Sequence, residues 1–200
     1  PHSGPSRTSP QRGTADSGVR APLRSASMSL DRTARPPVLA PSPAHDVWMD
    51  LALDEARAAA NHRDVPIGAV VVQVLDDASE PLAEPRVLTR RHNERELTSD
   101  GTAHAEVLAL RDACAALDRW RLDDCIMVVT LEPCPMCAGA LWATRIGGVV
   151  IGAESFEAGA LGTLYHLGQD PRLNHEFPVR AGVRREESAT LLQGFFASRR

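Results

Sequence analysis

The sequence predicts a three-layer α/β/α domain with a mixed sheet of roughly five strands. The run PIGAVVVQV at residues 66–74 is a continuous apolar stretch of the kind that forms a buried strand. Residues 86–93 provide a hairpin partner for it, across a polar connection at 76–85. From residue 125 the order strand, helix, strand requires a right-handed crossover and therefore parallel pairing. An antiparallel hairpin joined to a parallel unit makes the sheet mixed, with helices on its faces.

The other elements are predicted from apolar periodicity and from residues that begin helices. Asp46 can cap a first helix, whose apolar stripe includes Leu51, Leu53 and Ala56. The remaining elements are a helix from Thr102 to about Leu117, a strand at Cys125–Thr130, a helix from Cys134 to about Thr144, a strand at Gly148–Gly152 and a closing helix at Leu191–Ala197. No internal repeat is visible.

Residues 1–45 differ in composition from residues 46–200. They hold eight of the 15 prolines, and six arginines against two aspartates, which gives them a net charge of +4. Because few large apolar side chains are present to offset the entropy of ordering, we predict a disordered tail at 1–45 and one domain at 46–200. The Arg- and Ser-rich composition is also typical of an organellar transit peptide. The alternatives are a native unstructured extension or a start site placed too early.

The predicted domain is acidic. The chain has a net charge of −4, so residues 46–200 carry −8, and all 22 basic residues are arginine. Non-specific nucleic-acid binding rests on clustered positive charge, so an RNA partner must be held locally. Candidates for a phosphate-binding edge are Arg145, Arg184, Arg185, Arg199 and Arg200. Neither a membrane span nor a signal peptide is visible, which favours a soluble cytoplasmic protein without a membrane partner.

Three residues have the chemistry and spacing of a zinc site. Cys134 and Cys137 stand in PCPMC at the start of a predicted helix, so both thiols can point to one place from its first turn. The free N–H groups and the dipole of that helix end favour thiolates. His104, in TAHAEV, opens another predicted helix. Two thiolates and an imidazole favour a single Zn²⁺ and leave its fourth position open to water.

Glu106 is the predicted catalytic residue. It lies two positions after His104, where its carboxylate can take a proton from zinc-bound water and pass it to a leaving amine. The pattern His-x-Glu followed by Pro-Cys-x-x-Cys is the signature of zinc deaminases. A zinc-dependent hydrolase without an organic cofactor is therefore predicted. The alternative from another class is a structural zinc module, completed by Cys114 or Cys125, that only binds RNA or a partner.

Similarity to a known family extends beyond the metal motif. The matching segments are DVPIGA (64–69), HN (92–93), TAHAE (102–106), TLEPCPMCAGA (130–140), LNH (173–175) and GFF (194–196). With these segments the chain, from about Val47 to Arg200, resembles the bacterial tRNA-specific adenosine deaminases of the cytidine/deoxycytidylate deaminase superfamily. The resemblance implies the cytidine deaminase-like fold and a homodimer. It also implies hydrolytic conversion of adenosine to inosine at the wobble position of a tRNA anticodon, with an arginine tRNA as the expected substrate.

The resemblance also implies contacts with the substrate. Asn93 matches an asparagine that hydrogen-bonds the target nucleoside, and Ile67 matches a residue that walls the base pocket. Ala105 and Cys134 would supply backbone contacts. A target base must leave its stack to reach the metal, which a nucleotide in a loop permits at low cost.

Two positions depart from the family pattern. After the segment VVIGA (149–153) the family usually carries an Asp, which contacts RNA next to the target, and then a Lys. This chain has Ser155 and Glu157 at those positions. The open alternative is a small-molecule deaminase of guanine, cytosine or a nucleoside, which would have the same zinc site. The residues that flank the Cys motif, Thr130-Leu131 and Ala138–Ala140, fit the tRNA type better.

Overall fold

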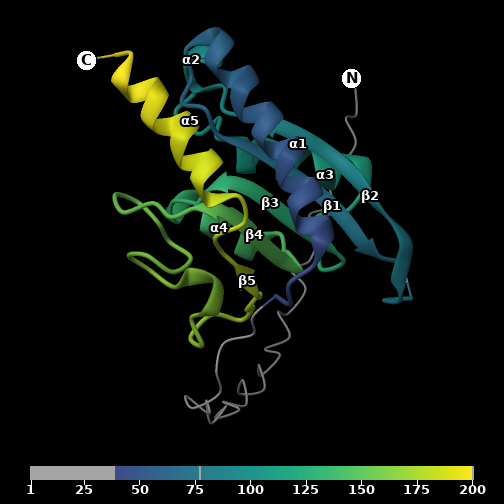
Figure 1. Ribbon diagram of the computed structural model, residues 1–200. Helices are drawn as coiled ribbons and strands as arrows, with labels where there is room; N and C mark the ends of the chain where they lie inside the picture. The colour runs from purple at the N-terminus through teal and green to yellow at the C-terminus, as the bar shows by residue number, and fades with distance from the viewer. Residues whose placement is uncertain (1–38, 77, 200) are drawn as a thin grey trace, which may run out of the picture. The chain divides into compact units, whose positions relative to one another are not determined.

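The computed structural model describes residues 39–76 and 78–199 (Figure 1), so most of the predicted tail lies outside the described residues. In chain order the elements are α1 (Pro43–Ala59), the 3-10 helix η1 (Ala60–His62), β1 (Gly68–Leu75), β2 (Pro81–His92), α2 (Arg95–Thr98), α3 (Ala105–Ala116), β3 (Cys125–Leu131), α4 (Pro135–Ala143), β4 (Gly148–Ala153), the 3-10 helix η2 (Leu167–Gln169), β5 (Val179–Arg180) and α5 (Arg185–Ala197). None of the helices in these ranges has the length and apolar character that crossing a membrane requires.

The sheet has the predicted mixed topology. Its five strands lie in the order β2-β1-β3-β4-β5. β1 pairs antiparallel with both β2 and β3, whereas β4 pairs parallel with β3 and with β5. At the centre of the sheet Val128 lies opposite Val70 on one side and Val150 on the other. The predicted hairpin (β1 and β2) and the predicted parallel unit (β3 and β4) therefore join where β1 pairs with the central strand β3.

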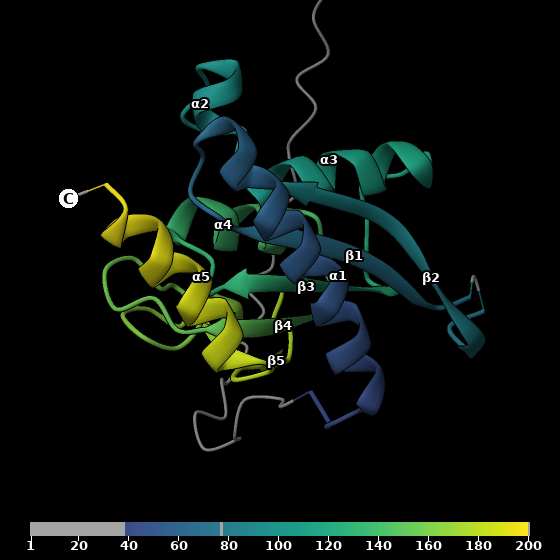
Figure 2. The same cartoon turned by 45° about the horizontal axis from the view of Figure 1, so that its top comes forward.

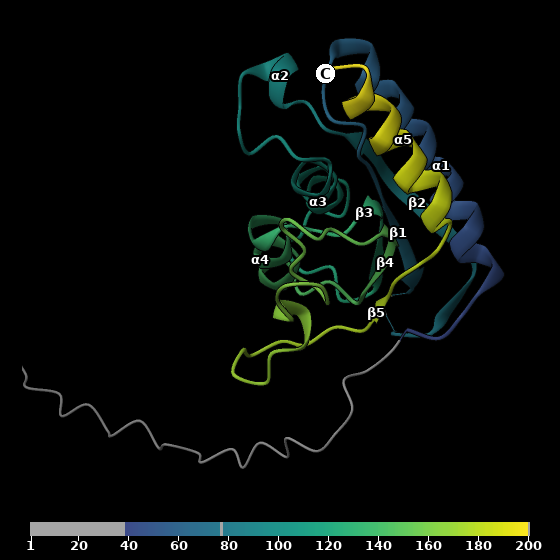
Figure 3. The same cartoon turned by 60° about the vertical axis from the view of Figure 1, so that its left-hand side comes forward.

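Helices cover both faces of the sheet, as the apolar strands predict. α1 and α5 lie side by side over one face (Figure 2), and α3 and α4 cover the other (Figure 3). Alternate residues of β1 belong to different core clusters, because side chains of a strand point to opposite faces. Val70 packs with Leu53 of α1, and Val71 packs in the cluster that contains Leu110 of α3. The three-layer α/β/α prediction is confirmed.

The predicted cap of the first helix is wrong. α1 begins at Pro43, and its N-cap is Ser42, whose hydroxyl accepts a hydrogen bond from the backbone N–H of Ala44 at 3.3 Å. Asp46 lies within the first turn instead. Proline is favoured at the first helical position because its missing N–H would have no partner there, so the Pro-rich end of the predicted tail already belongs to the helix.

Two other elements extend beyond their predicted bounds. β2 begins at Pro81, so half of the predicted polar connection is strand. β2 is an edge strand, where a proline is tolerated because its missing N–H need not face a neighbour. The closing helix α5 begins at Arg185, six residues before the predicted Leu191. Its first turns are polar and give no apolar period to detect.

The topology places the starts of α3 and α4 at the same edge of the sheet. The segment after α3 returns through β3, which leads into α4, so the two helices run in the same direction on the same face (Figure 3). His104 immediately precedes α3, and Cys134 immediately precedes α4. Residues separated by 30 positions in the sequence therefore meet at one point.

Gly68 determines how closely α1 packs on the sheet. A Cβ atom at this position would overlap the carbonyl oxygen of Ala52 and the backbone nitrogen of Ala56, neither of which can move without displacing α1. We expect Gly68→Ala to lower the free energy of unfolding by about 2–3 kcal/mol, as measured by urea denaturation. The matched control is Gly194→Ala in α5, which has open space at its Cβ position and should raise stability by roughly 0.5–1 kcal/mol. Equal effects of the two substitutions would contradict this packing.

Candidate metal centre and active site

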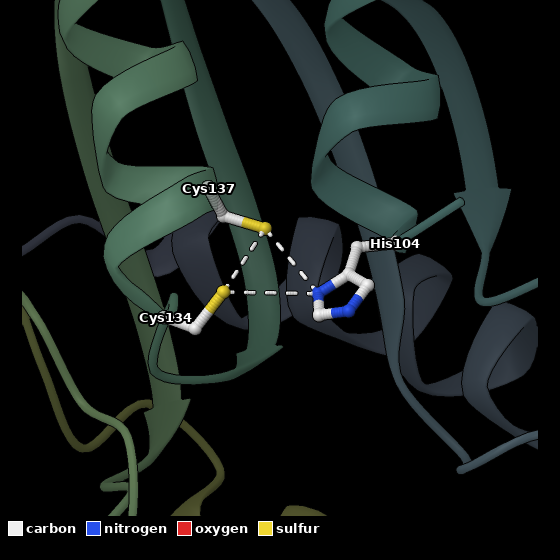
Figure 4. Close-up of side chains that lie close together, drawn as sticks. All are labelled: His104, Cys134 and Cys137. Atoms are coloured by element: carbon white, nitrogen blue, oxygen red, sulfur yellow. Dashed lines mark hydrogen bonds between the residues drawn. The ribbon is translucent and has the colours of Figure 1, made fainter. Parts of the chain in front are cut away.

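The three predicted metal ligands meet in one cluster (Figure 4). The ligand atoms of His104, Cys134 and Cys137 all lie within 4.8 Å of one another. The Sγ atoms of Cys134 and Cys137 are 3.7 Å apart, and Nδ1 of His104 lies 3.8 Å from the first and 3.5 Å from the second. Among the described residues, these three form the only cluster of this kind.

The distances between these atoms fit a tetrahedral ion. Bonds of about 2.3 Å to sulfur and about 2.0 Å to nitrogen place two sulfur ligands about 3.8 Å apart, and a sulfur and a nitrogen ligand about 3.5 Å apart. The observed separations of 3.5–3.8 Å agree with these values. Two thiols and an imidazole are donors that zinc prefers, and three protein ligands leave one position open.

The helix starts explain why the ligands converge. His104 and Cys134 occupy the N-cap positions of α3 and α4, both with extended backbone and without a side-chain capping bond. Pro135 at the start of α4 fits that position, and Cys137 follows within the first turn. Two positive helix ends therefore point at the cluster, which favours thiolate ligands.

The two thiols are strongly coupled. Their mutual hydrogen bond, together with His104, lowers the pKa of Cys134 to about 3. The same bond and the burial of Cys137 raise the pKa of Cys137. Binding of a metal ion requires both cysteines as thiolates, so it would release the proton of the Cys137 thiol.

Glu106 is buried beside the metal ligands. It is 3% exposed, and its Oε2 atom has no hydrogen-bond partner among the described residues. Burial raises the pKa of this carboxyl above its ordinary value. A buried carboxylate oxygen without a hydrogen-bond partner destabilises the fold. Its presence therefore indicates a group that hydrogen-bonds a bound ligand. The structure thus places Glu106 where the sequence pattern predicts a proton carrier.

Asn93 is hydrogen-bonded to both of the other predicted substrate-binding residues. Its side chain is 1% exposed, and its Oδ1 accepts a hydrogen bond of 2.9 Å from the backbone N–H of Ala105. Its Nδ2 donates to the carbonyl of Val65 at 3.3 Å, and its backbone N–H donates to the carbonyl of Ile67. Asn93, Ala105 and Ile67 are therefore neighbours. Asn93 also fixes the start of α3 next to His104.

Two buried carboxylates that sequence reasoning assigned no role support the site. Asp64 accepts hydrogen bonds from the backbone N–H groups of Glu96 and Leu97, which anchors α2. Glu132, two positions before Cys134, accepts from the backbone N–H groups of Leu161 and Thr163 at 3.0 Å. A carboxylate directly after a buried strand was the available signal for Glu132.

The remaining cysteines take no part in the cluster. Cys125 is buried on β3 and its thiol contacts Asp124, while the Cys114 thiol contacts the carbonyl of Trp120. These are the positions of ordinary core and surface cysteines. The alternative of a structural zinc site completed by Cys114 or Cys125 lacks a fourth ligand within the described part of the chain.

Two arginines of the predicted edge are neutralised by ion pairs. Arg184 pairs with Asp50 and Glu187, and Arg185 pairs with Glu154. Arg145 donates a hydrogen bond to Asn174 and lies over a tryptophan ring, and Arg199 lies over the ring of Phe195. Arg200 lies outside the described residues. Arg184 and Arg185 therefore do not form a free cationic edge.

Comparison with known proteins agrees with this site. The model of the MafB19-like deaminase family matches residues 44–200. The tRNA-specific adenosine deaminase of Bacillus subtilis (strain 168) is 42% identical over 151 residues, which span 76% of this chain and 88% of the relative. This chain belongs to the tRNA-specific adenosine deaminase family. The family member from Haemophilus influenzae is 40% identical over 152 residues, covering 76% of this chain and 83% of its own length.

Solved structures of deaminases share the fold. A structure from a study of A-to-I editing by tRNA:A34 deaminases at the wobble position matches with a TM-score of 0.65 and 40% identity, over 73% of this chain and 99% of that one. A guanine deaminase from Nitrosomonas europaea matches with a TM-score of 0.62 at 25% identity, over 82% of this chain and 88% of that one. The cytidine deaminase-like fold is confirmed.

The cluster predicts how metal content depends on single residues. We expect Cys134→Ala and Cys137→Ser to reduce bound zinc from about one ion to less than 0.1 per chain, since each removes one of only three protein ligands. Elemental analysis of the purified variants measures this. Cys114→Ser is the matched control and should keep its zinc, because its thiol lies outside the cluster and donates to the carbonyl of Trp120. Full zinc in Cys134→Ala would contradict the assignment.

Proposed function

We propose that this chain deaminates adenosine to inosine at the wobble position of a tRNA anticodon, as a homodimer with one Zn²⁺ in each subunit. His104, Cys134 and Cys137 hold the zinc, and Glu106 moves the proton. An arginine tRNA is the proposed substrate. The reaction is hydrolytic, so water supplies the oxygen of the product and the amino group leaves as ammonia.

The relation to adenosine deaminases supports this choice of substrate. Relatives at 36–42% identity are tRNA-specific adenosine deaminases, and this chain spans 81–88% of their length. The guanine deaminase neighbour is 25% identical. The observation that carries the chemistry is the buried carboxylate of Glu106, with an unpartnered oxygen beside three metal-ligand atoms.

Glu106 is placed to move protons in both halves of the reaction. When bound, zinc lowers the pKa of a coordinated water so that a nucleophile is present at neutral pH. Glu106 would accept a proton from the attacking water and donate it to the departing amine, so the carboxylate ends as it began. Its burial excludes bulk water, and the unpartnered Oε2 is free to make the transfer.

Asn93, Ile67 and Ala105 are the proposed contacts with the base. The N–H of Ala105 is committed to Asn93, so Ala105 would contact the base through its carbonyl oxygen. One N–H of the Asn93 amide donates to Val65, which leaves the other for the nucleoside. Ile67 is 9% exposed and would present an apolar wall. A base flipped out of a loop would be held by these groups against Glu106.

Exposed apolar side chains support the proposed homodimer. Met136 on α4, and Leu164 and Tyr165 on the segment between β4 and η2, are large hydrophobic residues with substantial exposure. That segment lies beside α4 (Figure 3). A second copy of the chain would remove this apolar area from water.

Glu106→Gln separates proton transfer from metal binding and folding. The amide has nearly the same shape but cannot carry the proton. We expect unchanged zinc content and thermal stability within a few degrees, with inosine formation on an arginine-tRNA anticodon stem-loop reduced by at least about 100-fold. Glu84→Gln, at an exposed position of β2, should retain wild-type turnover.

The same assay decides between the two substrate classes. Wild-type protein is assayed on the stem-loop and, in parallel, on free guanine, cytosine and adenosine. Turnover of the stem-loop alone would support the proposal. Turnover of a free base without inosine in the stem-loop would move the chain to the small-molecule deaminases, and retained turnover in Glu106→Gln would remove Glu106 from the mechanism.

A further inference from the structure

Phe156 is the most exposed large hydrophobic side chain in the described part of the protein. It is 81% exposed and lies directly after β4, in the segment that runs past α4. Burial of an aromatic ring is favourable, so a partner molecule that covers this ring would gain binding free energy.

A closed turn presents this ring. The hydroxyl of Ser155 accepts a hydrogen bond from the backbone N–H of Ala158 at 3.3 Å. The carbonyl of Ser155 accepts a second one, of 2.9 Å, from Gly159. Phe156 therefore stands at the tip of a short turn whose ends are bonded to each other. Little conformational entropy remains to be lost from this turn when a partner binds.

The turn is fixed to the segment that carries the metal ligands. The carboxylate of Glu132 accepts a 3.1 Å hydrogen bond from the backbone N–H of Ser155, at the start of the turn. The backbone N–H of Ala160, just after the turn, donates to the carbonyl of Pro133 at 2.9 Å. Pro133 immediately precedes the ligand Cys134. The position of Phe156 is thus coupled to the active site through two short connections.

The charges around Phe156 disfavour a phosphate contact. Glu157 follows the ring directly, is exposed, and has no ion-pair partner among the described residues. Glu154 precedes the turn and neutralises Arg185. Carboxylates repel the RNA backbone, so an RNA segment on this turn must approach with its bases. Stacking on an aromatic ring suits that approach, because every base has a π-face.

We propose that Phe156 stacks on a nucleobase adjacent to the target adenosine and thereby positions the anticodon loop in the active site. This inference rests on the proposed function, since it requires an RNA substrate. Single-stranded loops are commonly recognised by splayed bases stacked on aromatic side chains. Phe156 would act on binding and not on the chemical step, which makes it a positioning residue.

The test compares Phe156 variants of the zinc-loaded protein on the anticodon stem-loop. Phe156→Ala should raise KM and the dissociation constant roughly 5- to 150-fold, with kcat within about twofold. Phe156→Trp should restore binding, and Phe156→Leu, which is apolar but cannot stack, should not. The matched control is Trp120→Ala. Trp120 is also an exposed aromatic residue, 56% exposed, but it lies beyond the end of α3 opposite to His104.

A thermodynamic cycle identifies the stacked base. Stem-loops with an abasic site directly 5′ or 3′ of the target are bound to wild-type and to Phe156→Ala protein. If Phe156 stacks on one of these bases, removing that base weakens wild-type binding and has little further effect in Phe156→Ala. Additive losses at both positions, or unchanged binding by Phe156→Ala, would overturn the proposal.

Sedimentation velocity tests whether the Phe156 ring lies in a contact between copies of the chain. A change of oligomeric state in Phe156→Ala would place the ring in such a contact and would overturn the stacking role. An unchanged oligomeric state together with weaker binding of the stem-loop is the expected result.

Dissociation constants, measured independently of turnover, separate failure of this inference from failure of the proposed function. Wild-type protein that binds the stem-loop without deaminating it would refute the proposed function, while the comparison of Phe156 variants still decides this inference. Absence of binding would overturn both.

Discussion

The site depends on one constraint, that α3 and α4 begin side by side at the same edge of the sheet. In the sequence β3 lies between the two helices, and it runs in the opposite direction to both. Each helix therefore starts at the end of the sheet where β3 ends. This arrangement brings His104 to within 3.8 Å of both cysteine thiols. It also directs two helix N-termini at the cluster, which favours thiolates there. Gly68 contributes from the opposite face, where the close approach of α1 holds the sheet in place.

Glu132 connects the start of α4 to the segment that contains Ser155, Leu161 and Thr163. Burial alone would raise the pKa of Glu132, but hydrogen bonds from Thr163, Ser155 and Leu161 hold it below its ordinary value, so the carboxylate stays charged. A charged acceptor makes stronger hydrogen bonds than a neutral one. One carboxylate thereby joins the end of β3 to a segment 23–31 residues later. The segment that bears Phe156 is thereby fixed to the residues that precede α4.

The sequence predicts a feature when its chemistry requires particular residue types. It does not predict a boundary when the same residue is compatible with several local structures. The cluster of His104 with Cys134, and the mixed sheet that unites them, were predictable because zinc accepts few donors and buried strands need continuous apolar runs. The start of α1 at Pro43 and the start of β2 at Pro81 were not predictable, because proline marks loops, helix starts and edge strands alike. Glu132 was visible as a residue, but its partners lie too far along the chain to infer from spacing.

The charge distribution limits how this chain can hold an RNA. Residues 46–200 carry a net charge of −8, and the two arginines at the start of the closing helix form ion pairs, Arg184 with Asp50 and Glu187 and Arg185 with Glu154. Counterion release from phosphates therefore contributes less here than in a basic RNA-binding protein. The affinity for the RNA and its position in the site must therefore come from interactions that do not depend on net charge. These are shape complementarity, hydrogen bonds to the flipped base and stacking. Such contacts form only when the loop is correctly seated, so in an acidic domain the same interactions that bind the substrate also select it.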